Sequence, residues 1–243
     1  DPNGNPSSGI ERIQTTHGQF GMNSDIHTSS AGGADDWPND DYLNIWVCNI
    51  QSGLLGYASQ PSNFIGDGDG LVIGHQYFGR IGTVQAPYHK GRTATHEIGH
   101  WLNLDHVWGG SGSCGNDQVA DTPIQETENY SCPAFPLNPN SCNTTNLNGD
   151  MFMNYMDYTN DACMNLFTNG QKDRMRSAIN LYRPNMLGNN CDGSVGVIDH
   201  KNNNRKLIKI VDILGRISSN KQTNTALFYI YDNGSVEKKM VVK

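Results

Sequence analysis

The chain has 243 residues, enough for one domain with a substantial core and a smaller additional part. Its formal net charge of −7 is unevenly distributed, because residues 199–243 carry +5 and the preceding residues carry −12. The main body is acidic and has no stretch of basic residues with aromatic residues between them, which argues against a nucleic-acid partner. No apolar run is long enough for a membrane span and no signal peptide is visible, so we expect a soluble chain.

Three short strands and a helix are predicted after an N-terminal region of loops. Residues 1–40 are rich in Gly, Pro, Asn and Ser, which favours loops and turns. Apolar, β-rich segments bounded by turn residues predict strands at residues 42–48, 54–59 and 71–73. A helix is expected at about residues 92–103, where apolar side chains can pack it into a core.

Four of the six cysteines lie in or just after a long region without predicted secondary structure. Residues 109–150 are rich in Gly, Pro, Asn and Ser, and ordering so long a loop costs conformational entropy. The cysteines concerned are Cys114, Cys132, Cys142 and Cys163. Because their spacing fits no common four-cysteine zinc site, we interpret them as disulfide partners in an oxidising compartment.

A second helix is expected at about residues 168–182, with Thr168 as its N-cap. Its inward-facing residues are predicted to be Met175, Ile179 and either Leu181 or Tyr182.

The composition changes towards the C-terminus, which predicts a domain boundary. Residues 189–204 have the character of a linker between a main domain at 1–188 and a β-rich tail at 205–243. Strands are predicted at about residues 207–214, 226–231 and 235–242, with a hairpin turn at Asn233-Gly234. The sequence therefore predicts an α+β main domain followed by a small all-β tail.

The segment His96-Glu97-Ile98-Gly99-His100, followed by His106, indicates the chemistry. Residues four apart share a helix face, so His96 and His100 can direct two imidazoles at one point, with Glu97 beside it. His106 can reach the same point only if the helix ends near Asn103 and the chain bends back. Three neutral histidines leave the fourth position of a tetrahedral zinc ion open, which is typical of a catalytic site.

This histidine motif and several other segments resemble the pappalysin family of metzincin zinc peptidases. The similarity extends over about residues 35–183 and includes residues 57–58, 69–73, 91–95, 107–109, 121–123, 154–158 and 161–164. The resemblance implies a small twisted sheet, an active-site helix, a long disulfide-stapled loop region and a C-terminal helix. Metzincins begin with a strand, a long helix and a further strand that this sequence lacks. Either the domain is a fragment truncated at its N-terminus, which we expect, or its sheet is built from only about three strands.

The resemblance also assigns roles around the zinc ion. The implied zinc ligands are the three histidines of the motif, His96, His100 and His106. Glu97 would act as the general base, and Met156 would form the tight turn beneath the metal. Tyr158 would be a removable ligand or would stabilise the oxyanion, although an ordinary packed tyrosine remains an alternative.

Further implied residues concern the substrate and a second metal. Asp161 would lie at the base of the pocket for the residue after the scissile bond, favouring Arg or Lys there. Asp161 could instead be a solvated residue in a turn or bind calcium. Structural calcium is implied near residues 116–122, with Asp117, Asp121 and Thr122 as candidate ligands. Asp-rich turns without calcium are equally common.

Disulfides and one departure from the family pattern follow from the same resemblance. It pairs Cys114 with Cys142 and Cys132 with Cys163, while Cys48 and Cys191 either pair together or stay free. Asn103 stands where metzincins have a glycine with left-handed backbone. Asn is the non-glycine residue best suited to that conformation, so the change is expected to be tolerated.

The tail resembles, more loosely, the C-terminal sorting domains of the type IX secretion system, and a generic β-module is the alternative. The main hypothesis is a secreted or cell-surface zinc endopeptidase, expected to be a monomer. Its expected partners are protein or peptide substrates and, through the tail, secretion machinery. One rival is a non-catalytic surface-binding protein on a degenerate or truncated scaffold. Another is an enzyme whose third ligand is Glu126 or Glu128, which His106 makes unnecessary.

Overall fold

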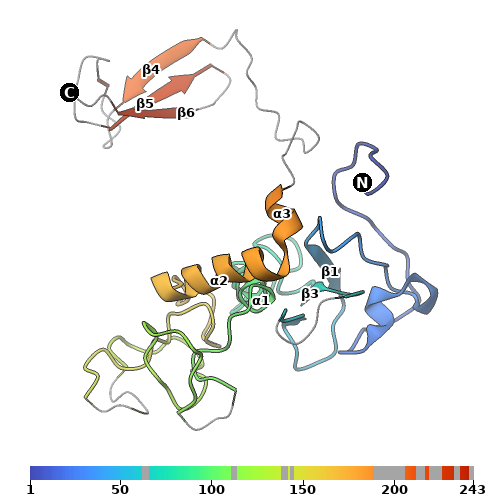
Figure 1. The fold of residues 1–243 in the computed structure, drawn as a ribbon, viewed down its shortest axis with the longest axis horizontal. Coiled ribbons are helices and arrows are strands. Elements are labelled where there is room, and N and C mark those ends of the chain that lie inside the picture. Colours follow the sequence, from blue (N-terminus) through green and yellow to red (C-terminus); the bar gives the residue numbers. More distant parts are fainter. Residues whose placement is uncertain are drawn as a thin grey trace. The chain divides into compact units, whose positions relative to one another are not determined.

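The computed structural model describes residues 1–61, 66–110, 114–137, 142, 145–188, 206–211, 217–218, 226–232 and 236–240. The chain divides into two compact units, Asp1–Asn190 and Cys191–Lys243 (Figure 1). Within the described ranges, no helix combines the length and apolar character that crossing a bilayer requires.

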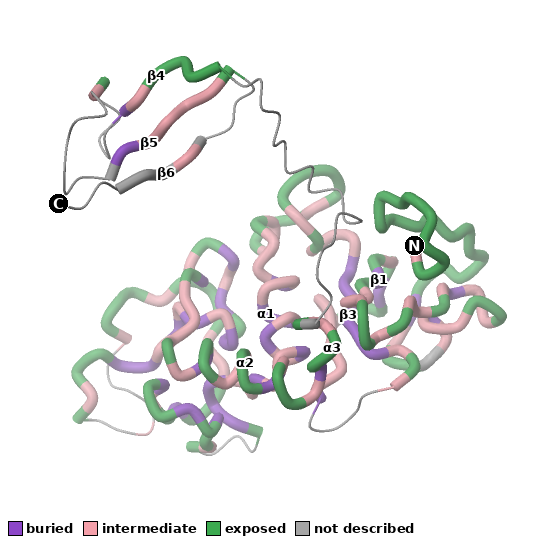
Figure 2. Tube along the Cα trace, turned by 45° about the horizontal axis from the view of Figure 1, so that its top comes forward, coloured by how far each residue is buried: buried purple, intermediate pink, exposed green. Residues whose placement is uncertain are grey.

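The first unit contains a small mixed sheet at the three predicted strand positions. The strands are β1 (Asn44–Cys48), β2 (Gly56–Ala58) and β3 (Gly70–Gly74), in the order β1-β3-β2. β3 pairs in parallel with β1 and antiparallel with β2. All five residues of β3 are buried, as expected for a central strand covered on both faces (Figure 2).

Alternating side chains of the sheet enter two separate clusters. One face packs with N-terminal residues in the cluster Phe20, Ile26, Trp46, Ile50 and Val72. The opposite face packs against the helix Arg92–Trp101 in the cluster Leu71, Ile73 and Trp101. The sheet therefore provides a rigid support for that helix.

Three α-helices follow the sheet in the described part of the first unit. They are α1 (Arg92–Trp101), α2 (Asn169–Tyr182) and the short α3 (Pro184–Gly188). Two 3-10 helices, Ser24–His27 and Ser29–Ala31, lie in the N-terminal region predicted to form loops. The prediction of loops was therefore incomplete there.

The N-terminus of α2 has the predicted cap, but its inward face differs from the prediction. The Thr168 hydroxyl accepts a hydrogen bond from the Gln171 N–H in a capping box. Met175 packs against an apolar cluster, whereas Leu181 is 70 % exposed, so Tyr182 was the better alternative. Buried Gln171 belongs to this face because its amide forms hydrogen bonds with Asn154.

The C-terminus of α1 ends in a Schellman motif with Asn103 in the left-handed region. Asn103 has a φ of 68°. The Asn103 N–H donates to the His100 carbonyl at 2.8 Å, and the Leu104 N–H donates to the Gly99 carbonyl at 2.9 Å. The helix thus ends where the histidine spacing required, and the expectation that Asn replaces Gly in this conformation is confirmed.

Substitutions of Asn103 should separate backbone conformation from side-chain chemistry. Asn103→Ala is expected to destabilise the protein by about 1 kcal/mol, because Ala adopts the left-handed region less readily than Asn does. Asn103→Gly should leave the free energy of unfolding within about 0.5 kcal/mol, because it removes the Cβ and also the buried, unpartnered Oδ1. Urea unfolding of both variants measures the difference, and equal stability of the two would contradict the conformational explanation.

Two disulfides join parts of the long loop region. Cys114 is bonded to Cys142 and Cys132 to Cys163, the pairs implied by the family resemblance. Cys48 is a free, half-buried thiol, and burial raises its pKa to about 11. Cys191 lies outside the described residues.

The second unit contains an antiparallel sheet in the order β4-β5-β6. Its strands are β4 (Leu207–Val211), β5 (Ala226–Tyr231) and β6 (Val236–Met240). These fall within the three predicted strand ranges. The predicted linker at 189–204 and the Asn233-Gly234 turn lie outside the described residues.

A buried ion pair ties the sheet to both long helices of the first unit. Arg183, directly after α2, donates from Nη2 to both carboxylate oxygens of Asp69 at 2.8 Å. Its guanidinium also lies 4.0 Å from the ring centroid of Trp101 on α1. Asp69 additionally accepts from the Trp101 indole N–H at 3.3 Å and from the Ser59 hydroxyl. All these contacts fix the sheet, α1 and the end of α2 relative to one another.

Candidate metal centre and active site

Three imidazoles converge at the C-terminal end of α1. The Nε2 atoms of His96 and His100 lie 3.1 Å apart, and that of His106 lies 3.2 Å from His96 and 3.0 Å from His100. They form the one group of His, Cys, Asp or Glu in the described residues with the spacing to hold a metal ion. The structure therefore brings together all three predicted ligands.

The tautomers of two histidines fit a bound cation. The Nδ1–H of His96 donates to the Tyr155 carbonyl at 2.7 Å, and that of His100 donates to the Leu104 carbonyl at 2.8 Å. Their Nε2 lone pairs consequently face the common centre, the arrangement usual for metal-ligating histidines. Nitrogens bound to one tetrahedral zinc ion lie about 3.3 Å apart, close to the observed spacing.

Burial keeps the imidazoles neutral, which metal binding requires. Desolvation lowers the pKa of His96 and of His100, and it lowers that of His106 to about 3. The neighbouring histidines act in the same direction on His96 and His106, because one positive charge disfavours another. The donor set, all neutral nitrogen, suits zinc.

Glu97 is buried beside this centre, next to the edge of the sheet. Burial raises the pKa of its carboxyl to about 8, and a bound dication would act in the opposite direction. A Cβ added to Gly56 of β2 would lie 3.2 Å from Cγ of Glu97. Because Gly56 has no side chain, it leaves the space that Glu97 occupies. The sequence analysis did not assign this role, although a glycine inside a strand can mark such a close approach.

Met156 is fully buried beneath α1. It packs with Leu104, Val107 and Trp108, and a Cβ at Gly99 would overlap its sulfur. The Met156 N–H donates to Asn154 Oδ1 at 2.9 Å, which holds the turn. Gly99, inside the histidine motif, is thus required for the close approach of helix and turn.

Two aromatic side chains contact the third histidine. The Tyr158 ring centroid lies 5.0 Å from that of His106 and 5.5 Å from that of His96. Burial, with the charge of Glu97, raises the pKa of Tyr158 to about 12, so its hydroxyl remains a hydrogen-bond donor. The Trp108 ring stacks on His106 at 4.3 Å with an interplanar angle of 7°, a contact that sequence analysis did not assign.

Asp161 lies at the beginning of the active-site helix. Its buried carboxylate accepts through Oδ2 from the backbone N–H groups of Lys90 at 2.6 Å and Arg92 at 3.2 Å. Negative charge at a helix N-terminus is favourable. Asp161 therefore helps to fix α1, whatever further role it has towards substrates.

The three candidate calcium ligands are only partly together. Asp117 is buried and accepts from the Thr122 hydroxyl at 2.7 Å. The Asp121 carboxylate instead accepts from the Thr168 hydroxyl at 2.7 Å and the Gly170 N–H at 2.9 Å, at the start of α2. A calcium site in this loop stays a prediction.

The mixed sheet, the three converging histidines and the buried methionine turn together define the metzincin class of metallopeptidase folds. A family model described as pregnancy-associated plasma protein-A matches residues 27–180, and the chain belongs to this family of M43 peptidases. The prediction of a pappalysin-type protein is thereby confirmed.

Solved structures and curated relatives agree with this membership. The chain is 52 % identical to mirolysin in complex with a molecule named compound 9, with a TM-score of 0.73 over 76 % of this chain and 71 % of that one. It is 51 % identical to mature mirolysin of Tannerella forsythia in complex with a cleaved peptide, over the same shares and with the same TM-score. An extracellular metalloprotease of Verticillium alfalfae is 41 % identical over 143 residues, 56 % of this chain and 49 % of that protein. The chain thus spans about half the length of this curated relative.

Proposed function

We propose that this protein is a secreted zinc-dependent endopeptidase. The observation that carries the proposal is the convergence of three neutral imidazole Nε2 atoms within 3.2 Å of one another. Glu97, the next residue after His96, provides a buried carboxylate beside them. Membership of the M43 family supports peptide hydrolysis, and the names of the extracellular relatives support secretion.

Each polar group of the site then has a defined task. His96, His100 and His106 would hold zinc, which when bound activates a water molecule and polarises the peptide carbonyl. Glu97 accepts the proton of the attacking water and passes it to the leaving amine. Tyr158, protonated over the physiological range, donates its hydroxyl hydrogen to the oxygen that becomes negative during attack.

The sheet provides a place for an extended substrate. β2 forms one edge of the sheet, and the Glu97 side chain lies against its Gly56. An extended peptide can pair with the free backbone groups of an edge strand. Such pairing would place a peptide bond beside the histidines and Glu97.

For the substrate, we propose a preference for Arg or Lys directly after the scissile bond, read by Asp161. Asp161→Asn should lower the ratio of kcat/KM for Arg over Leu at this position by about 10- to 100-fold, because a desolvated charge pair is lost. Asn keeps an oxygen that can accept the Lys90 and Arg92 N–H bonds, so α1 should remain in place. A ratio that stays at the wild-type value, with unchanged thermal stability, would remove this role from Asp161.

The remaining proposals concern export and a second ion. The β-sheet of the second unit would serve as a type IX sorting domain, and residues 116–122 would bind structural calcium. Deleting residues 205–243 should retain the protein inside a host that has this secretion system, without reducing peptidase activity. A calcium-dependent rise in melting temperature that Asp117→Asn abolishes would support the second ion.

The main proposal is tested by metal content together with cleavage of an unstructured, Arg-containing peptide. Purified protein should contain one zinc ion per chain, lose cleavage in a strong chelator and regain it with added zinc. Protein that binds zinc but cleaves no peptide would favour the non-catalytic rival. Protein that binds no zinc would contradict the metal centre itself.

A further inference from the structure

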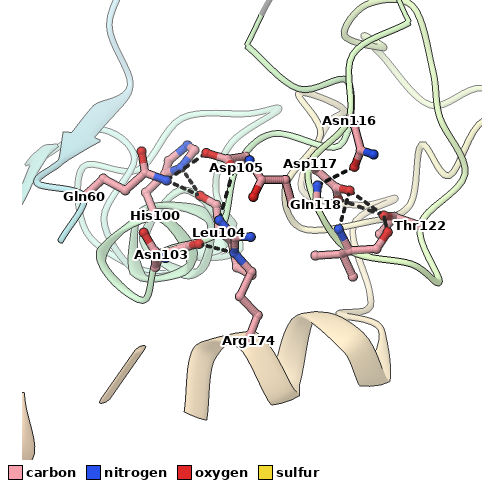
Figure 3. A network of polar contacts seen from close by, with 11 residues as sticks. Gln60, His100, Asn103, Leu104, Asp105, Asn116, Asp117, Gln118, Thr122 and Arg174 are labelled. Carbon is pink, nitrogen blue, oxygen red and sulfur yellow. Dashed lines mark hydrogen bonds and ion pairs between the residues drawn. The ribbon is translucent and has the colours of Figure 1, made fainter. Parts of the chain in front are cut away.

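The turn between the second and third histidines is held from two sides by side chains outside the histidine motif (Figure 3). This turn, residues 103–105, is called the ligand turn below. Arg174 on α2 donates from Nε to the Asn103 carbonyl at 2.6 Å and from Nη2 to Asp105 Oδ2 at 3.2 Å. From the other side, Gln60 Nε2 donates to Asp105 Oδ1 at 2.8 Å and to the Leu104 carbonyl at 3.3 Å.

The ligand turn acts directly on two of the three histidines. The Leu104 carbonyl accepts the Nδ1–H of His100 at 2.8 Å, which sets the tautomer and the plane of that imidazole. Asp105 is the residue before His106, so its position determines where the backbone of His106 lies and therefore where the third imidazole can reach. A shift of the ligand turn would therefore move both histidines relative to His96.

Arg174 is suited to fixing this turn in a way that other cations are not. Its Nε and Nη2 hydrogens lie on one edge of a planar group and reach a backbone carbonyl and a carboxylate at the same time. The Arg174 side chain is 22 % exposed and that of Asp105 is 32 % exposed, so the pair is partly shielded from solvent. The start of α2 is itself tied to other segments by hydrogen bonds of Gln171 with Asn154 and of Thr168 with Asp121, which makes the helix a stable base for this contact.

We infer that Arg174 is a positioning residue for the metal centre, holding the ligand turn so that His100 and His106 meet His96 at one point. Gln60 supports the same turn from the opposite side. This inference rests on the proposed zinc function, but it concerns how the site is preorganised rather than whether it exists. Removal of a residue that orients metal ligands typically lowers metal affinity about 10- to 100-fold.

The test measures zinc affinity of the full chain by competition with a chromophoric chelator. Arg174→Met and Arg174→Lys should each raise the zinc Kd by about 10- to 100-fold, because Lys keeps the charge but cannot make both contacts. Arg176→Met is the matched control, since Arg176 is an exposed arginine on the same helix. Its Kd should equal that of the wild type.

A spectroscopic readout separates positioning from general stability. The visible absorption bands of the cobalt-substituted protein should change in both Arg174 variants and stay unchanged in Arg176→Met. If Arg174→Met does not fold, Gln60→Met provides the second variant and should raise the Kd in the same direction. Wild-type affinity and spectra in the Arg174 variants would overturn the inference, whereas a wild-type protein that binds no zinc would overturn the proposed function.

Discussion

Glu97→Gln is expected to lower kcat/KM for peptide cleavage by about 10²- to 10⁴-fold while the protein keeps its zinc. Gln has nearly the same shape as Glu, so it fits the space beside Gly56, but its amide cannot accept the proton of the attacking water. The three histidines are unchanged, so the proposed zinc ligands remain. Steady-state kinetics on an unstructured peptide, with zinc measured in the same samples, gives the result.

The control for this variant is a neutral-for-neutral change away from the chemistry. Gln19→Ala, in the polar N-terminal region, should retain wild-type kinetics. Activity of Glu97→Gln within a few-fold of the wild type would mean that Glu97 is not the base. Loss of zinc together with activity would instead assign Glu97 a structural role at the site.

Arg183→Met is expected to lower the free energy of unfolding by about 3–5 kcal/mol, the largest stability effect expected for a single side chain here. Asp69 would then be buried without its cation, since both residues are almost fully buried. The contact of the guanidinium with Trp101 is lost as well. Urea unfolding followed by far-UV circular dichroism measures the change.

A double variant tests the explanation of this loss. Asp69→Asn combined with Arg183→Met removes both charges and keeps an acceptor for the Trp101 indole, so much of the lost stability should return. If the loss of unfolding free energy in the double variant equals the sum of the losses in the two single variants, the charge explanation is wrong and packing dominates.

The convergence of the three histidines could be predicted from the sequence, because it depends on residues that lie close together in the chain. His96 and His100 share a helix face by their spacing, and Asn103 marks the end of that helix. The requirement that His106 return to the same point then leaves few conformations. The strands of the sheet could be predicted equally well, since each strand is a short apolar run between turn residues.

Contacts between distant segments could not be predicted in this way. Asp69 and Arg183 are separated by 114 residues, and neither has an unusual sequence environment. The approach of Arg174 to the ligand turn depends on where α2 lies against α1, which no spacing rule gives. Periodicity allowed Leu181 to face inward, although it is exposed in the structure. Periodicity also gave no reason to bury the polar Gln171, which is buried because the amide of Asn154 is there to form hydrogen bonds with it.

The close fit of Met156 under α1 has a chemical consequence. Its side chain has no solvent contact, and its sulfur fills the space where a Cβ of residue 99 would lie. Conversion to the sulfoxide adds a polar oxygen, which this packing cannot accommodate. Peroxide should therefore reach the sulfur only while the helix and the turn separate, so the rate of sulfoxide formation reports how often the floor beneath the histidines opens.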